Sequence, residues 1–102
     1  MKKIGKLVRD NIPNIIKADG KKPITRKLND EEFLKELDRK LVEEQNEFQE
    51  AHDKEELADI LELVYAYCNY LDISFDDLEK LRRSKNQKNG GFSEAIYLEG
   101  VE

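Results

Sequence analysis

Two pairs of acidic side chains in this chain have the residue type and the spacing of a metal site. Glu44 and Glu47 form one pair, and Glu56 and Asp59 form the other, each pair being three residues apart. In a helix, residues three apart project from neighbouring turns of one face. Carboxylate oxygens are the ligands that a hard divalent cation such as Mg²⁺ takes. The two pairs therefore predict a cation site, provided that the fold brings them together.

Glu44 stands out because it falls within an apolar face. On a helical wheel at about 100° per residue, it lies between Phe33 and Leu37. The second acidic pair is flanked in the same way by apolar residues of its own segment. A carboxylate on a core face is costly unless something compensates its charge. The alternatives are a solvated acidic face and, for Glu56, a capping box closed with Asp53.

Two long helices joined by a short turn are the elements expected to position these acids. Periodicity predicts one helix over residues 30–50, with Asn29 as its N-cap, and another over residues 54–71. The link between them is short, so the helices should form an antiparallel hairpin. The hairpin would bring the end of the first helix, with Glu44, beside the start of the second, with Glu56.

Shorter elements are expected on both sides of the hairpin. Pro13 suits the first turn of a short helix, residues 13–18, that Gly20 would end. Ser74 opens another helix, which is expected to end near Arg83. The remaining expectations are an extended connector over residues 21–28, a flexible basic loop over residues 84–92, and a short strand or extended tail over residues 95–98.

The helix predicted over residues 54–71 is apolar around most of its circumference, and only the arc that holds Glu62 and Asn69 is clearly polar. Such a helix is buried on several sides, and one hairpin with short helices cannot surround it. We therefore expect an all-α fold in which one domain, residues 1–102, completes a four-helix-bundle-like core as a homodimer or a larger homo-oligomer.

The net charge of −5 over 102 residues conceals a strong asymmetry along the chain. Residues 1–27 carry a net charge of +7, residues 28–79 carry −14, and residues 80–102 carry +2. This distribution argues against a nucleic-acid polymer as partner, because such a partner needs a uniform basic face. It suits an acidic, metal-loaded centre that meets a phosphate-bearing ligand held by the cationic ends.

Cys68 is the single cysteine, which excludes an internal disulfide and fits a reducing cytoplasm. On a core face it reads as a small hydrophobic residue, and His52 reads as a surface residue of the hairpin turn. The longest apolar run is interrupted by Glu62 and is too short to cross a bilayer, and no signal peptide is recognisable. We expect a cytoplasmic protein with no membrane partner.

Basic residues near the end of the chain are candidates for phosphate contacts. Lys85 and Lys88 precede Gly90 and Gly91, and glycine lets backbone amides approach a phosphate while lysine supplies point charges. The alternative is an ordinary loop with a helix C-cap. The basic residues near the start of the chain, taken alone, indicate little beyond solubility.

Taken together, these segments resemble the MazG-like all-α nucleotide pyrophosphohydrolases, which include phosphoribosyl-ATP pyrophosphohydrolase and dimeric dUTPases. Residues 6–13 are similar to the K-L-V-R-D-x-I-P opening of a small bacterial, archaeal and phage branch. Residues 43–47 and 56–59 match the superfamily's E-E-x-x-E and E-x-x-D metal motifs. Residues 85–92 resemble that branch's terminal K-x-x-K-x-G-G-F, except that Asn89 stands where the branch usually carries Arg.

The resemblance implies Mg²⁺, or Mn²⁺ in its place, bound by Glu44, Glu47, Glu56 and Asp59. It also implies hydrolysis of a nucleoside triphosphate to the monophosphate and pyrophosphate. Either Glu44 or Glu47 would take the proton of the attacking water, and both alternatives stay open. The resemblance further implies substrate contacts from both basic ends, made by Lys6, Arg9, Asp10, Lys85, Lys88, Gly90 and Gly91.

The expected role is removal of non-standard or surplus nucleotides. Hydrolysis of phosphoribosyl-ATP in histidine biosynthesis would use the same chemistry and is a second possibility. The opening motif of residues 6–13 favours the other branch, because enzymes with the phosphoribosyl-ATP activity belong to a branch that lacks it. A non-catalytic helical interaction module, with acids that serve only solubility and pairing, is the alternative from a different class. It differs from an enzyme in showing no Mg²⁺-dependent thermal shift.

Overall fold

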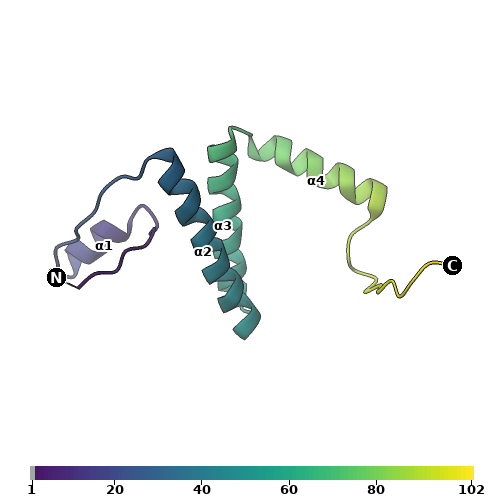
Figure 1. The fold of residues 1–102 in the computed structure, drawn as a ribbon, viewed down its shortest axis with the longest axis horizontal. Helices are drawn as coiled ribbons and strands as arrows, with labels where there is room; N and C mark the ends of the chain where they lie inside the picture. The colour runs from purple at the N-terminus through teal and green to yellow at the C-terminus, as the bar shows by residue number, and fades with distance from the viewer. Residues whose placement is uncertain (1) are drawn as a thin grey trace.

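A computed structural model describes residues 2–102 of the chain, and within that range the fold is all-α, with no strand. The helices are α1 (Ile12–Ala18), α2 (Asp30–Ala51), α3 (Lys54–Leu71) and α4 (Phe75–Asn89). Figure 1 shows α2 and α3 side by side, with α1 next to α2 and α4 extending away from the opposite side. The expected all-α class is therefore confirmed for this range.

The α2–α3 hairpin begins with the cap that the sequence predicts. The side chain of Asn29 accepts a hydrogen bond from the Glu32 backbone N–H at 2.9 Å, and the Glu32 carboxylate accepts one from the Asn29 N–H at 3.3 Å. These reciprocal bonds satisfy N–H groups that a helix start leaves unpaired. α2 ends where His52 takes the left-handed conformation, with φ 55° and ψ 36°, which turns the chain into α3.

The core of the hairpin is small. Leu37 of α2 and Leu63 and Cys68 of α3 are the described hydrophobic residues that are buried. The rings of Phe33 and Tyr70 extend this contact toward the open end of the hairpin, with centroids 6.5 Å apart. Burial of a leucine side chain contributes roughly 1.5–3 kcal/mol. The buried residues join α2 to α3, and the rest of the chain has no hydrophobic core of its own.

The segment before α2 folds back along that helix. The Ile12 N–H donates to the Arg9 carbonyl at 3.0 Å, which makes the turn that leads into α1. Pro13 lies in the first turn of α1, and Gly20, at φ +77°, follows its end. Both positions agree with the sequence, since proline suits a helix start and glycine a left-handed stop.

Across residues 2–102, no helix combines the length and the apolar character that crossing a membrane requires.

α4 is longer than the sequence predicts. It starts at the cap Ser74, whose hydroxyl oxygen accepts from the Asp77 N–H at 3.1 Å, and it continues past Arg83 to Asn89. The expectation of a loop from residue 84 was therefore wrong for residues 84–89, because that stretch contains neither proline nor glycine to stop the helix. Residues 95–98 belong to no helix or strand, and Ala95 has a left-handed φ of 53°, so the expected strand is absent from this segment.

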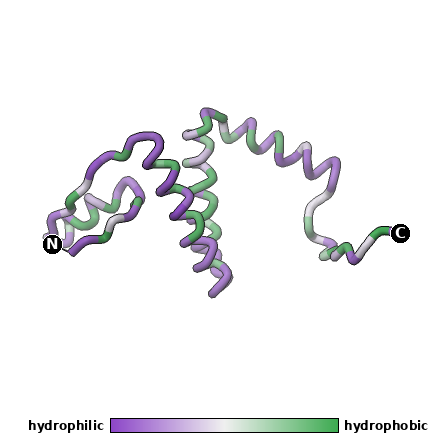
Figure 2. The backbone as a smooth tube through the Cα atoms, viewed as in Figure 1, coloured by the Kyte–Doolittle hydropathy of each residue, from purple (hydrophilic) through white to green (hydrophobic). Residues whose placement is uncertain are grey.

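The distribution of hydropathy follows this arrangement. Figure 2 shows hydrophobic residues along α3 and near the C-terminal end, whereas α4 is largely hydrophilic. Residues 80–102 are exposed throughout. The chain thus has a packed hairpin in the middle and, at its C-terminal end, a charged helix followed by an uncovered apolar tail.

Candidate functional site

Glu44 is a buried carboxylate with an unused oxygen. Only 6% of the residue is exposed, and its Oε2 atom has no hydrogen-bond partner among the described residues. Burial, together with the charges of Glu47 and Asp59, raises the pKa of the Glu44 carboxyl. Lys40 opposes this shift weakly, because its Nζ lies 3.9 Å from Oε1. The helical wheel of the sequence placed Glu44 on the core face, and the structure buries it there.

Glu56, at the start of α3, carries a second such oxygen. Its Oε2 atom is also buried and has no hydrogen-bond partner within residues 2–102. The hairpin packs the start of α3 against the end of α2, so both unpartnered oxygens lie on the same pair of helices. An unpaired buried carboxylate oxygen is costly. Both oxygens therefore lack a compensating group, and the carboxylates whose charges act on Glu44 are those of Glu47, Asp59 and Glu43.

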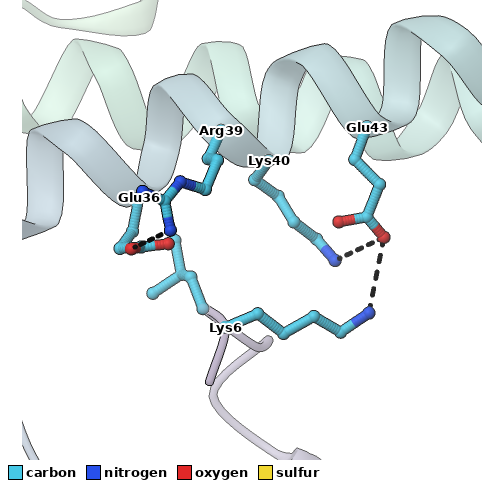
Figure 3. Close-up of a pocket in the computed structure, with 6 residues that line it drawn as sticks. Lys6, Glu36, Arg39, Lys40 and Glu43 are labelled. Atoms are coloured by element: carbon cyan, nitrogen blue, oxygen red, sulfur yellow. Dashed lines mark hydrogen bonds and ion pairs between the residues drawn. The ribbon is translucent and has the colours of Figure 1, made fainter. Parts of the chain in front are cut away.

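Asp59 and Glu43 are met by cations from the N-terminal segment. Arg9 Nη2 lies 2.6 Å from Asp59 Oδ1, and Lys6 Nζ lies 3.4 Å from Glu43 Oε1. Lys40 Nζ approaches the same Glu43 oxygen at 3.5 Å, so that two lysines share one carboxylate (Figure 3). The structure therefore places two of the predicted substrate-binding residues, Lys6 and Arg9, against carboxylates of the α2–α3 hairpin.

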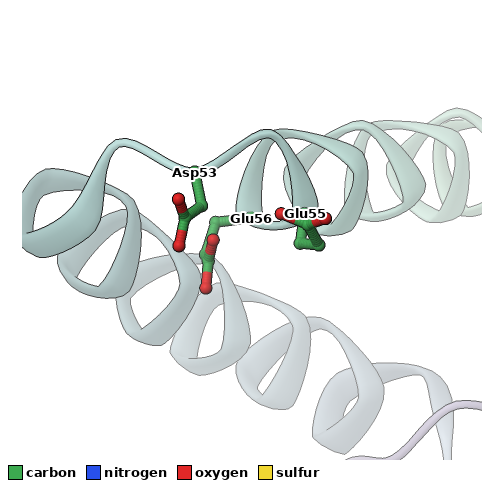
Figure 4. Close-up of side chains that lie close together, drawn as sticks. All are labelled: Asp53, Glu55 and Glu56. Carbon is green, nitrogen blue, oxygen red and sulfur yellow. The ribbon is translucent and has the colours of Figure 1, made fainter.

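Among residues 2–102, no three of the four predicted cation ligands, Glu44, Glu47, Glu56 and Asp59, bring carboxylate oxygens within 4.8 Å of one another. Glu47 is exposed, while Glu56 and Asp59 are half-buried. A different triad, Asp53, Glu55 and Glu56, places one carboxylate oxygen of each residue within 4.8 Å of the others (Figure 4). This triad shares only Glu56 with the four predicted ligands.

The alternative of a capping box closed by Asp53 and Glu56 is wrong for this structure. Asp53 does precede α3 in an extended conformation, but its side chain makes no capping hydrogen bond. The carboxylate instead lies near Glu55 and Glu56. The sequence does contain a signal for this proximity, because acids stand at positions 53, 55 and 56 around the start of α3. The search for acids three residues apart did not consider such a run.

The other predicted substrate contacts lie away from the carboxylates. Lys85 and Lys88 are on α4, and Gly90 and Gly91 follow it, with Gly90 ending the helix at φ +81°. α4 starts near the end of α3 that is remote from the hairpin turn, and Figure 1 shows it pointing away from the hairpin. Within one chain these residues do not join Glu44 and Asp59. Asp10 is exposed in the turn before α1.

A cavity of about 490 Å³ lies at that same remote end of the hairpin. Asp30 and Phe33 of α2 and Asn69 and Tyr70 of α3 line it. Its position near the start of α2 separates it from the acidic residues near the hairpin turn. It is therefore not part of the candidate cation site.

The donor chemistry of the candidate site fits a hard divalent cation. The residues on offer are carboxylates only, and oxygen donors are what Mg²⁺ and Ca²⁺ prefer over softer metals. The unpartnered Oε2 atoms of Glu44 and Glu56 are free to accept a cation, whereas Asp59 would have to share its oxygen with Arg9 or release it. The arrangement can bind a cation and, beside it, place two basic side chains.

Comparison with known proteins gives a partial match. An uncharacterized protein of Mycolicibacterium smegmatis is 42% identical over 52 residues, which is 51% of this chain and 53% of that protein. The chain thus spans about half the length of the relative that it matches. No protein-family model matches the chain, and no solved structure matches it.

Proposed function

We propose that this chain is a Mg²⁺-dependent nucleoside triphosphate pyrophosphohydrolase of the MazG-like all-α superfamily. It would act as a homodimer or larger homo-oligomer in the cytoplasm, on non-standard or surplus nucleotides. The observation that carries the proposal is the buried Glu44, whose unpartnered oxygen lies on the helix packed against that of Glu56. A cation would compensate both carboxylates, and the motifs of residues 43–47 and 56–59 supply the reaction class.

In the reaction, water attacks the α-phosphorus of the triphosphate. The water oxygen bonds to that phosphorus, the bridging oxygen to the β-phosphorus departs with pyrophosphate, and the nucleoside monophosphate remains. Glu44, Glu47, Glu56 and Asp59 would hold the ion; when bound, Mg²⁺ supplies charge neutralisation at the phosphates and lowers the pKa of a water.

The side chains of this chain supply the proton acceptor. Glu47 is exposed one turn after Glu44 and can meet a water directly. Glu44 is buried, and its Oε2 atom has no hydrogen-bond partner within residues 2–102, so this oxygen is free to accept a proton. One of the two accepts the proton of the attacking water, and a carboxamide at that position cannot.

Basic side chains of the N-terminal segment supply the charge for the leaving group. Lys6 and Arg9 already pair with carboxylates of the hairpin. Lys6 Nζ lies 3.4 Å from Glu43 Oε1, and Arg9 Nη2 lies 2.6 Å from Asp59 Oδ1. When a triphosphate arrives, each can exchange a carboxylate for a phosphate oxygen. Cations placed in this way stabilise the negative charge that grows on the leaving pyrophosphate.

The second candidate is a non-catalytic helical interaction module. The Arg9–Asp59 ion pair favours it, because an internal cation already neutralises one of the proposed metal ligands. In that case Mg²⁺ would add nothing to stability, and the acids would serve solubility and pairing.

The deciding experiment is pyrophosphate release from a panel of standard, deoxy and damaged nucleotides and phosphoribosyl-ATP, with Mg²⁺, Mn²⁺ or EDTA. We expect metal-dependent release, lost in Glu44→Gln and in Asp59→Asn but retained in Glu31→Gln, an exposed glutamate at the start of α2. Preference for phosphoribosyl-ATP would move the proposal to histidine biosynthesis. No release from any substrate, together with no Mg²⁺-dependent thermal shift, would establish the non-catalytic alternative.

A further inference from the structure

A small cavity with an excess of positive charge lies between the N-terminal segment and α2. It measures about 40 Å³ and is lined by Lys6, Leu7, Glu36, Arg39, Lys40 and Glu43 (Figure 3). A water molecule needs roughly 10–15 Å³, so the cavity has room for a few oxygen atoms. Three of its side chains are basic and two are acidic, although the whole chain has a net charge of −5. The cavity therefore suits an anion.

Two lysines of this cavity place their ammonium groups on one oxygen atom. Lys6 Nζ lies 3.4 Å and Lys40 Nζ lies 3.5 Å from Glu43 Oε1, and Figure 3 shows both side chains directed at that oxygen. Lys40 and Glu43 are neighbours on one helix, which is a common pairing, but Lys6 comes from 37 residues away. A carboxylate carries a single negative charge, so two ammonium groups at one of its oxygens repel each other without full compensation. A phosphate group, with more charge and more oxygens, would compensate both.

Lys40 also connects this cavity to the predicted cation site. Its side chain is 20% exposed, against 48% for that of Lys6. Its Nζ lies 3.9 Å from Oε1 of the buried Glu44. The anion cavity and the predicted cation site are thus neighbours, as the two parts of a site for a metal-bound polyphosphate must be.

We propose that this cavity is a polyphosphate-binding site, in which Lys6 and Lys40 hold a phosphate group of the ligand and Glu43 takes that place until the ligand arrives. Binding exchanges one anion for another, because the two lysines leave Glu43 Oε1 and pair with phosphate oxygens. Lys40 is then a ligand-binding residue that belongs to neither basic end of the chain, and Glu43 is an internal competitor. The link to triphosphate hydrolysis rests on the proposed function; the binding of the anion does not.

Pyrophosphate binding tests the site without catalysis. Isothermal titration calorimetry in metal-free buffer of low ionic strength measures its Kd. Lys40→Gln should raise the Kd about tenfold, the equivalent of one charge-assisted hydrogen bond. Lys6→Gln, at an exposed position outside the helices, should raise it in the same way without altering α2.

Glu43→Gln should have the opposite effect and lower the Kd for pyrophosphate by about threefold or more, because the amide releases both lysines and removes a charge that repels the ligand. These opposite signs distinguish exchange from a structural role of the Lys40–Glu43 pair, since a structural pair would weaken binding whichever partner is changed. Lys35→Gln and Glu31→Gln are the matched controls. Both residues are exposed on α2 outside the cavity, so the Kd should not change.

The inference is overturned if the wild type does not bind pyrophosphate, if Lys40→Gln binds it as the wild type does, or if Glu43→Gln binds it more weakly. Nucleotide hydrolysis by the same wild type is measured separately. An active enzyme whose pyrophosphate affinity does not depend on Lys40 keeps the proposed function and loses this site. A protein that binds pyrophosphate with the expected responses but hydrolyses no nucleotide keeps the site and loses the proposed function.

Discussion

The guanidinium of Arg9 donates to Oδ1 of Asp59 at 2.6 Å, across 50 residues of sequence. The Arg9 side chain is 55% exposed and that of Asp59 is 38% exposed, so water reaches both partners. Exposed ion pairs contribute at most about 1 kcal/mol to folding. The pair therefore fixes where the N-terminal segment lies without being essential for the fold, and it keeps a cation next to a proposed metal ligand.

Arg9→Gln should separate these two roles. Because the pair is exposed, we expect the free energy of unfolding to change by less than about 1 kcal/mol. Because Arg9 is proposed to exchange Asp59 for a phosphate oxygen, the KM for nucleotide should rise by about tenfold or more, the equivalent of one charge-assisted hydrogen bond. Urea denaturation and initial rates of pyrophosphate release measure the two effects.

Arg26→Gln is the control for Arg9→Gln. Arg26 also pairs with a carboxylate, since its two terminal nitrogens lie 3.3 and 2.9 Å from the oxygens of Glu32, but it does so at the start of α2. It should lose a similar amount of stability with no change in KM. Equal effects of the two variants on KM would remove Arg9 from the substrate site.

The buried Glu44 predicts how stability depends on pH when no metal is bound. Burial and the charges of Glu47 and Asp59 raise the pKa of Glu44 in the folded chain, so the folded state holds its proton more tightly than the unfolded state. The stability from this group is present below the ordinary glutamate pKa of about 4.3 and is lost as pH rises through the raised value.

Glu44→Gln should remove this loss. In EDTA, the difference in unfolding free energy between Glu44→Gln and wild type should grow in favour of the variant as pH rises from about 4 to 7. Denaturation at a series of pH values measures it, with Glu31→Gln as a control for the loss of one exposed acid. Parallel curves for wild type and Glu44→Gln would mean that Glu44 is solvated in solution.

Tyr67 links α3 to α2 through a hydrogen bond from its hydroxyl to Asp38 Oδ1 at 2.6 Å. Burial and the adjacent carboxylate raise the pKa of Tyr67 to about 12. The folded state thus favours neutral tyrosine, so this contribution is present below pH 10 and is lost as pH rises toward 12. Tyr67→Phe should cost about 1 kcal/mol at pH 7.

Ultraviolet titration identifies the Tyr67 hydroxyl. The ionisation that occurs near pH 12 in the folded wild type should be missing in Tyr67→Phe and retained in Tyr97→Phe, which alters an exposed residue of the tail. Stability is compared at pH 7 by urea denaturation. A high-pH step that survives in Tyr67→Phe would assign it to another tyrosine.

The local signals of the sequence were sufficient for the hairpin. Asn29 with Glu32 specifies the start of α2, and the short link before Lys54 allows only a tight turn, so both helices agree with the structure to within a residue. The burial of Glu44 follows from the same periodicity. These features depend on neighbours in sequence or on one helix face, which a single sequence contains.

Features that depend on contacts across the chain were not predicted. The ring of Tyr65 stacks on that of Phe75 at the junction of α3 and α4, and helical periodicity does not predict this contact. The direction that α4 takes from this junction separates Lys85 from the carboxylates. The position of Arg9 on Asp59 likewise depends on how residues 2–11 fold back over α2. Composition favoured cations near the acids but did not indicate which basic end would reach them within one chain.

The two caps of the hairpin give a final test, because only one of them uses its side chain. Asn29 bonds the Glu32 N–H at 2.9 Å, whereas Asp53 precedes α3 without a capping hydrogen bond and lies among acids. Asn29→Ala should therefore destabilise the chain by about 1 kcal/mol, while Asp53→Ala should cost less, since it also relieves repulsion with Glu56. Urea denaturation in EDTA compares the variants. An equal or larger loss for Asp53→Ala would mean that Asp53 caps α3 in solution. Its carboxylate would then accept hydrogen bonds from backbone N–H groups at the start of α3.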